Sequence, residues 1–234
     1  MVMCSISVMA LRPTSTLKTS RSLSSPSMSS QNPTINRRDS PRPPCFVGLG
    51  ANLDSAHGSP AQAVLAAAGA LVPLSAVPVL LSSLWQTTPV DCPPGSPVFI
   101  NAVAAIIPLD TFSQDHEGAL ELLHALQRLE ADFGRVRGDQ VNAPRIIDVD
   151  LLCWGDLVLE TTVLTLPHPR MLERRFVLEP LAQIAPGLVP PGCEHPITAR
   201  LAQLPDQGEI QRIKIDDASV SLISGVYTTD QLST

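Results

Sequence analysis

The chain has 234 residues, of which 44% are hydrophobic and 16% are charged, and its formal net charge at pH 7 is −6. This length is enough for one domain with a hydrophobic core and barely enough for two. No apolar run approaches the ~20 residues of a membrane-spanning helix, and the acidic balance argues against nucleic acid as a partner. The five cysteines are widely spread without zinc-like spacing, so a reducing compartment is expected.

Residues 1–44 differ in composition from the rest of the chain. They are rich in Ser, Thr, Pro and Arg, and Asp39 is their only acidic residue. Such a segment buries too little apolar surface to fold, and its basic character is typical of an organelle transit peptide. A disordered tail or a start codon placed too far upstream are the alternatives. The expected location is therefore cytoplasmic, or a plastid or mitochondrion if this segment is a targeting peptide.

The first half of the remaining chain alternates between strand and helix patterns. Residues 45–50 (CFVGLG) read as a short buried strand. The helix that follows has Ser59 as its N-cap and Pro60 at its first position. Two further strands are expected over residues 77–90 and 98–109, separated by a loop rich in Pro and Gly.

The second half begins with a helix over about 117–133, which carries an apolar stripe formed by Leu122, Leu126, Leu129 and Phe133. The stretch APRIIDVDLLCWGD (143–156) is the fourth strand, and LVLET (157–161) is expected to pair with it across a tight turn. A shorter helix is predicted over 174–185 and an extra strand over 209–215, and the last twenty residues look loosely ordered.

The order β-α-β-β-α-β predicts an α+β domain with the ferredoxin-like arrangement. Its sheet would be antiparallel, with both helices on one face and the opposite face open for a ligand and the active site. The catalytic domain is expected to span residues 45–204. It would be flanked by the extension 1–44 and by residues 205–234, whose structure the sequence leaves undefined.

Two aspartates, Asp148 and Asp150, interrupt the most strand-like run of the chain. Residues i and i+2 of a strand point to one face, so these carboxylates lie together, with Cα atoms ~6.6 Å apart. Ile147, Val149 and Leu151 would face the helices. Two parallel carboxylates repel, and a cation between them removes that cost. Mg²⁺ suits such ligands, although both aspartates could instead face water on an open sheet.

The arginines are concentrated in one region. Residues 45–127 contain no Lys or Arg, whereas seven arginines and no lysine follow between residues 128 and 175: Arg128, Arg135, Arg137, Arg145, Arg170, Arg174 and Arg175. Guanidinium groups are favoured where a planar fork grips phosphate or carboxylate. Beside the two aspartates, they favour a metal–nucleotide site over a solvated surface. No Walker-type loop is present, so side chains must bind the phosphates.

Two weaker signals are His168 and Asn101. His168 could donate to a phosphate oxygen, although a lone histidine is more often structural. Asn101 interrupts an apolar strand on the same face as Phe99. A buried amide needs partners, which a flat heterocycle with a donor–acceptor edge would supply and which neighbouring backbone would supply equally well. The short motif GLGAN (48–52) reads as a tight strand exit.

Several motifs together resemble one known family. They are GLGANL, WQTTPV, FINAV, QRLEADFGRVRGDQVNAPRIIDVDLL and LPHPRMLERRFVLEPL. From about Phe46 to Leu204 the chain is similar to the 6-hydroxymethyl-7,8-dihydropterin pyrophosphokinase family. This resemblance implies the ferredoxin-like fold and an ATP-dependent diphosphokinase of folate biosynthesis. In that reaction the β,γ-pyrophosphoryl group of ATP moves to the hydroxymethyl oxygen of the pterin, and AMP is released.

The resemblance also implies the roles of individual residues. Asp148 and Asp150 would hold two Mg²⁺ ions that bridge the ATP phosphates, and Arg135 and Arg145 would act with them in catalysis. The nucleotide would contact Gln127, Arg137, Arg145, Leu151, Thr165, His168 and Arg174. The pterin would contact Thr87, Val90, Phe99, Asn101, Asp148 and Phe176. Asn142 and Pro169 replace aromatic residues that many members carry, which bears on how the substrate-covering loop closes.

Two rival functions are compatible with parts of the pattern. A palm-like nucleotidyl transferase or cyclase also sets two aspartates on a ferredoxin-like sheet, but the acidic surface and the missing lysines argue against its nucleic-acid groove. A non-catalytic binding module would have no reason to keep Asp148 and Asp150 beside an arginine cluster. The chain is expected to be monofunctional and monomeric, with small-molecule substrates and no membrane partner.

Overall fold

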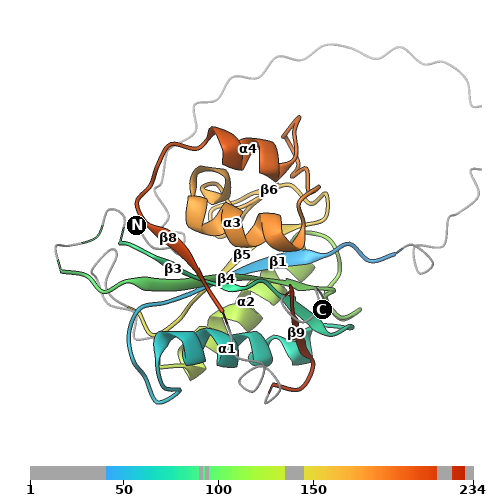
Figure 1. Cartoon of the computed structure of the whole chain (residues 1–234). Helices are drawn as coiled ribbons and strands as arrows, with labels where there is room; N and C mark the ends of the chain where they lie inside the picture. The colour runs from blue at the N-terminus through green and yellow to red at the C-terminus, as the bar shows by residue number, and fades with distance from the viewer. Residues whose placement is uncertain (1–40, 90–91, 93–94, 135–144, 215–222, 230–234) are drawn as a thin grey trace, which may run out of the picture.

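The computed structural model describes residues 41–89, 92, 95–134, 145–214 and 223–229. A seven-stranded sheet forms its centre and carries helices on both faces, as Figure 1 shows. Within these ranges, no helix combines the length and the apolar character that crossing a membrane would require.

The observed elements follow the predicted order with additions. They are β1 (Cys45–Ala51), α1 (Pro60–Ala70), the 3-10 helix η2 (Val72–Leu74), β2 (Val79–Leu81), β3 (Leu84–Thr87), β4 (Phe99–Ile106), α2 (His116–Asp132), β5 (Asp148–Trp154), β6 (Leu159–Glu160), β7 (Thr165–Leu166), the 3-10 helix η3 (Met171–Glu173), α3 (Arg175–Ile184), α4 (Ile197–Gln203), β8 (Ile210–Ile213) and β9 (Val226–Thr228). Ser59 caps α1 through its hydroxyl and Pro60 is its first residue, as predicted.

The strand expected over 77–90 is divided into β2 and β3 at two buried serines. The Ser82 Oγ accepts the backbone N–H of Val103 at 3.0 Å and donates to the Ser83 carbonyl oxygen at 2.8 Å. The Ser83 N–H donates to the side chain of Gln183 in α3 at 2.9 Å. The Ser82 N–H still donates to the Val103 carbonyl oxygen at 2.9 Å, whereas at Ser83 a side chain takes the place of a strand partner. The single continuous strand is therefore a wrong prediction.

The strand order is β5-β1-β4-β2-β9, and β3 pairs with both β4 and β8. β1 runs antiparallel to β4 and β5, whereas β9 runs parallel to β2, so the sheet is mixed and not wholly antiparallel. The predicted extra strand over 209–215 is confirmed as β8, and part of the last twenty residues is the ordered strand β9.

The segment 157–161 does not pair with β5 as expected. β6 instead pairs with β7 in a separate two-stranded sheet. The Thr161 hydroxyl accepts the backbone N–H of Val163 at 3.2 Å and of Leu164 at 2.9 Å. This local turn brings the chain back on itself, so that the hydrogen bonds of β6 go to β7.

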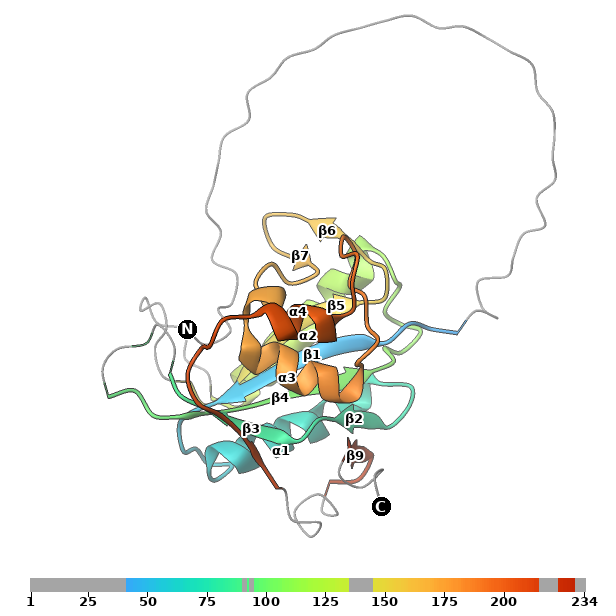
Figure 2. The same ribbon diagram turned by 45° about the horizontal axis from the view of Figure 1, so that its top comes forward.

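Both faces of the sheet are covered in part (Figures 1 and 2). One face packs against α1 and α2, and its strand residues include Leu49, Val149 and Leu151, in agreement with the predicted alternation. A second cluster on the other face joins Val103 to α3 and α4 residues. The expectation of an open second face is therefore wrong in part, because α3 packs on β3 and β4.

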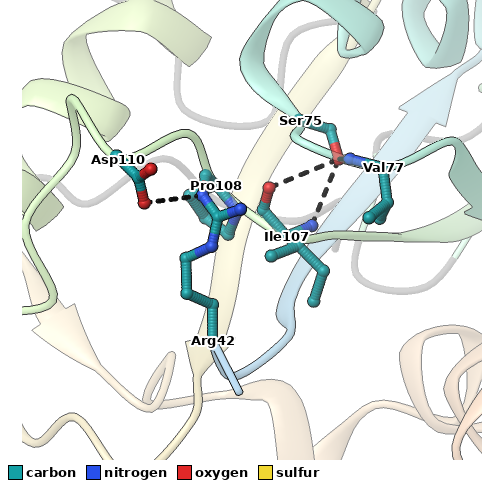
Figure 3. A network of polar contacts seen from close by, with 6 residues as sticks. All are labelled: Arg42, Ser75, Val77, Ile107, Pro108 and Asp110. Carbon is teal, nitrogen blue, oxygen red and sulfur yellow. Dashed lines mark hydrogen bonds and ion pairs between the residues drawn. The ribbon is translucent and has the colours of Figure 1, made fainter. Parts of the chain in front are cut away.

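A small polar network fastens the chain around the C-terminal end of β4, as Figure 3 shows. Arg42 Nη1 donates to Asp110 Oδ1 at 2.8 Å and to the Pro108 carbonyl oxygen at 3.2 Å. Asp110 is largely exposed, and pairs of this kind contribute ~0–1 kcal/mol. The Ser75 Oγ accepts the N–H of Ile107 at 3.2 Å. This network joins elements of the fold at the opposite end of β4 from the predicted pterin residues.

Candidate active site

The site is organised by β5, the edge strand that carries Asp148 and Asp150. In the register with β1, Asp148 lies opposite Gly50 and Asp150 lies opposite Gly48. The two aspartates are 0% and 8% exposed. Because their neighbour Val149 packs toward the helices, both carboxylates belong to the other face of the sheet.

Arg145 lies directly against the first aspartate. Its Nη1 is 3.0 Å from both Oδ1 and Oδ2 of Asp148, and the two side chains are 12% and 0% exposed. A buried carboxylate requires a counter-charge or hydrogen-bond donors, and this guanidinium supplies both. A cation bound at the same oxygens would compete with Arg145 and release a guanidinium suited to phosphate.

Asn52 fixes the backbone of Arg145 and was not anticipated from the sequence. The Arg145 N–H donates to Asn52 Oδ1 at 2.8 Å, and the Asn52 N–H donates to the Arg145 carbonyl oxygen at 3.2 Å. Asn52 is buried and directly follows β1. A polar residue at the end of a buried strand, inside GLGAN, was the available signal. It holds the segment leading into β5 beside the sheet.

Glu130 of α2 was also missed. Its Oε1 accepts the backbone N–H of Val149 at 2.8 Å, and the side chain is buried. Because β5 is an edge strand of the described sheet, this N–H has no strand partner among the described residues, and the Glu130 carboxylate of α2 accepts it instead. The signal lies in helical spacing: Glu130 is four residues after Leu126, on the buried stripe. The contact holds β5 at the Asp148–Val149 peptide, between the two aspartates.

A pocket lies where α2 meets the edge of β5. It is lined by Leu123, Gln127, Glu130, Val149, Asp150, Leu151, Val163, Leu164 and His168. Four of the predicted site residues line this pocket, although they come from three parts of the chain: Gln127 from α2, Asp150 and Leu151 from β5, and His168 from the loop after β7. The cavity measures about 40 Å³, far less than the ~300 Å³ of a small-molecule site. A cavity of this size holds at most about one or two water molecules, so these described residues alone do not enclose a small molecule.

His168 is held in a defined protonation state. Burial, together with the positive charges of Arg174 and Arg170, lowers the pKa of its imidazole from 6.5 to about 4. The ring Nδ1 accepts the N–H of Arg170 at 3.2 Å. At neutral pH the ring is therefore uncharged, with its proton on Nε2. The His168 N–H donates to the Leu152 carbonyl oxygen at 2.6 Å, which fastens the loop to β5.

Arg174 and Phe176 lie at the start of α3. The guanidinium carbon of Arg174 is 5.5 Å from the centroid of the Phe176 ring, a cation–π arrangement. Arg174 is buried, whereas Phe176 is half-buried. A residue predicted to bind the nucleotide is thus in contact with one predicted to bind the pterin.

Asn101 is the third residue of β4 and lies near other predicted pterin residues. Its Nδ2 donates to Thr87 Oγ1 at 2.9 Å, so a side chain is the partner of this buried amide. Thr87 pairs with Phe99 across β3 and β4. Asn101 lies opposite Gly50, which in turn lies opposite Asp148. Asn101 and Asp148 are therefore two strand spacings apart, or ~10 Å.

The motif GLGAN contains the end of β1, at Ala51, as the interpretation of a strand exit predicted. Gly48 and Gly50 lie within β1, between the aspartates of β5 and the residues of β4. Neither glycine has a side chain to project between Asp148 and Asn101.

Other predicted residues are not brought into this group. Arg135, Arg137, Val90 and Asn142 lie outside the described residues. Thr165 is in β7 and pairs with Glu160. Among the residues that the structure describes, no group of three or more His, Cys, Asp or Glu side chains could hold a metal ion.

Comparisons with known proteins identify the family. The family model of 7,8-dihydro-6-hydroxymethylpterin-pyrophosphokinase (HPPK) matches residues 46–186. The 2-amino-4-hydroxy-6-hydroxymethyldihydropteridine pyrophosphokinase of Pseudomonas aeruginosa is 38% identical over 169 residues, covering 72% of this chain and 95% of that protein. The folic acid synthesis protein fol1 of Schizosaccharomyces pombe is 32% identical over 164 residues. This chain spans 21% of that longer protein.

Solved structures support the fold at a lower level of identity. A crystal structure of a Plasmodium falciparum HPPK-DHPS triple mutant aligns with a TM-score of 0.52 at 12% identity, covering 74% of this chain and 46% of that one. This likeness concerns a mixed α+β fold with a central sheet. The family assignment rests on the sequence comparison, in which the family model matches residues 46–186. The chain belongs to the 7,8-dihydro-6-hydroxymethylpterin-pyrophosphokinase family.

Proposed function

We propose that this protein transfers the β,γ-pyrophosphoryl group of ATP to 6-hydroxymethyl-7,8-dihydropterin in folate biosynthesis. The observation that carries the proposal is the register across β5, β1 and β4, in which Asp148 and Asn101 share a face with Gly50 between them. A carboxylate suited to bind the metal ion of a metal–phosphate complex thus lies ~10 Å from an amide suited to read a heterocycle. Family membership and the name of the Pseudomonas aeruginosa relative support this assignment.

The ferredoxin-like arrangement is part of the same proposal. It is supported by the central position of β1 and β4, by β5 and β2 on either side of them, and by α1 and α2 on one face. The helices α3 and α4, with β8 and β9, are additions to that arrangement.

In the proposed nucleotide site, His168 and the arginines bind phosphate oxygens. A neutral imidazole with its proton on Nε2 donates a hydrogen bond without adding charge. Arg145 and Arg174 neutralise the negative charge that spreads over the transferring group. Gln127 and Leu151 would contact the rest of the nucleotide from the pocket between α2 and β5. Arg135 and Arg137 keep the roles that the family resemblance implies.

Asp148 and Asp150 are proposed to hold Mg²⁺. The donor set fits this ion, because both are buried carboxylates on one face and Mg²⁺ is usually held by one or two carboxylates plus phosphate oxygens. When bound, the metal would neutralise the triphosphate and orient it for in-line transfer. The residue that must yield is Arg145, whose Nη1 now lies 3.0 Å from both oxygens of Asp148.

In the proposed pterin site, Asn101 reads the edge of the heterocycle. One N–H of its amide is engaged by Thr87, which leaves Oδ1 and the second N–H for a ligand. Phe99 and Phe176 would stack on the two sides of the ring. The pterin hydroxyl oxygen forms a bond to the β-phosphorus, the bond from that phosphorus to the α,β-bridging oxygen breaks, and AMP leaves. The hydroxyl proton passes to water, and no side chain is assigned as a general base.

The test is an incubation of the purified protein with ATP, Mg²⁺ and 6-hydroxymethyl-7,8-dihydropterin. AMP should accumulate when the pterin is present and stay at background when it is omitted. A nucleotidyl cyclase or transferase would release pyrophosphate without needing the pterin, and a non-catalytic binding module would leave ATP intact. Either result would contradict the proposal.

A further inference from the structure

Gln207 precedes β8 and lies beyond the residues that the family model matches. Its Oε1 accepts the backbone N–H of Arg175 at 2.8 Å, and its Nε2 donates to the carbonyl oxygen of Glu173 at 2.6 Å. These two backbone groups lie on either side of Arg174. One amide side chain therefore holds both peptide neighbours of a proposed phosphate ligand.

The start of α3 depends on this contact. Arg174 occupies the N-cap position and makes no side-chain cap hydrogen bond. The first N–H groups of a helix have no partner within the helix. Gln207 accepts the N–H of Arg175 from 32 residues away, and so replaces a local cap. The direction in which α3 presents Phe176 is thereby tied to the C-terminal segment.

The turn that carries Gln207 is fastened to the end of β3. Gly208 has a φ of +92°, and a Cβ built there would lie 2.5 Å from Thr88 Oγ1. Its N–H donates to Asp206 Oδ1 at 3.0 Å. The Thr88 N–H donates to the carbonyl oxygen of Glu209 at 3.1 Å. The positive φ favours glycine at 208, and any larger residue there would also require the Thr88 hydroxyl to move.

The segment therefore spans the two walls of the proposed pterin site. A pocket is lined by Thr87, Thr88, Arg175, Phe176, Gln207, Gly208, Glu209 and Ile210. Thr87 belongs to the wall formed by β3, and Phe176 to the wall formed by α3. Residues 207–210 lie between these walls. The side chain of Gln207 binds the backbone at the start of α3, and Ile210 pairs with Thr87 of β3.

We propose that Gln207 is a positioning residue, which sets the orientation of Arg174 and Phe176 relative to β3 for pterin binding and transfer. This inference rests on the proposed function of the same site. Gln207 acts through the backbone of Glu173 and Arg175. Loss of its side chain should therefore change the pterin KM and kcat while the protein still folds.

The experiment compares Gln207→Ala with Gln211→Ala, a matched control at an exposed position of β8. Gln207→Ala should raise the KM for the pterin and lower kcat, each by about 10-fold, as expected when two hydrogen bonds, one part-buried and one exposed, are lost together. The KM for ATP should change less. Gln211→Ala should behave as the wild type.

Gln207→Glu provides the conservative variant. It keeps the acceptor for the Arg175 N–H and loses the donor to the Glu173 carbonyl, so its pterin KM should fall between those of the wild type and Gln207→Ala. If Gln207→Ala fails to fold, the kinetic constants of Gln207→Glu are compared with those of Gln211→Ala instead. Normal kinetic constants in folded Gln207 variants, with active wild-type protein, would overturn this inference alone. A wild-type protein without pterin-dependent AMP formation would overturn both this inference and the proposed function.

Discussion

Replacing Asp148 by alanine in the metal-free protein removes a charged partner of the largely buried Arg145 guanidinium. The two side chains are 0% and 12% exposed, and Arg145 Nη1 contacts both carboxylate oxygens. Breaking a fully buried pair costs ~3–5 kcal/mol. Because Arg145 keeps limited access to water, we expect Asp148→Ala to lower the free energy of unfolding by ~2–3 kcal/mol. The repulsion between Asp148 and Asp150, considered alone, would instead make this substitution stabilising.

A double-mutant cycle separates these two effects. The single variants Arg145→Ala and Asp148→Ala and the double variant are unfolded with urea in the presence of EDTA. We expect a coupling free energy of ~1–3 kcal/mol between the two side chains. The i,i+4 pair Arg175–Glu179, whose atoms are also 3.0 Å apart but whose side chains are 34% and 19% exposed, is the control and should couple by ~0.3–0.5 kcal/mol. An Asp148→Ala protein at least as stable as the wild type would refute the reasoning.

Three further predictions concern the two halves of the site. Asp150→Asn should abolish AMP formation while leaving the EDTA-treated protein folded, and near-normal turnover would exclude this residue as a metal ligand. Asn101→Ala should weaken pterin binding ~10- to 100-fold by calorimetry and spare ATP; the reverse pattern would contradict the assignment of Asn101. Because burial lowers the pKa of His168 to about 4, its contribution to stability is complete above pH 6.5 and is lost as the pH falls toward 4. The urea midpoint of His168→Gln should therefore depend less on pH than that of the wild type. An equal pH dependence of the two midpoints would show that titration of His168 is not its cause.

Local patterns predicted the elements that carry the site. The period of two in β5 indicated that Asp148 and Asp150 share a face, and the stripe of α2 indicated a buried helix beside them. Both inferences depend on neighbours within a few positions of the chain. Ser59 and Pro60 likewise marked the start of α1, because a helix cap is a local structure.

The contacts that hold the site together could not be predicted in the same way. Glu130 reaches Val149 across 19 positions of the sequence, and Asn52 reaches Arg145 across 93. Such pairs are set by the packing of α2 and β1 on β5, which no local pattern records. The division of 77–90 into β2 and β3 has the same cause, since Ser82 bonds to a backbone group of β4.

The measurement that tests the central claim most directly follows the phosphorus atoms of ATP into the products. ATP labelled with radioactive phosphorus at the α, β or γ position is incubated with the protein, Mg²⁺ and 6-hydroxymethyl-7,8-dihydropterin. The account predicts that the β and γ labels both appear in the pterin product and that the α label stays in AMP. Transfer of the γ label alone, with ADP as the second product, would contradict pyrophosphoryl transfer.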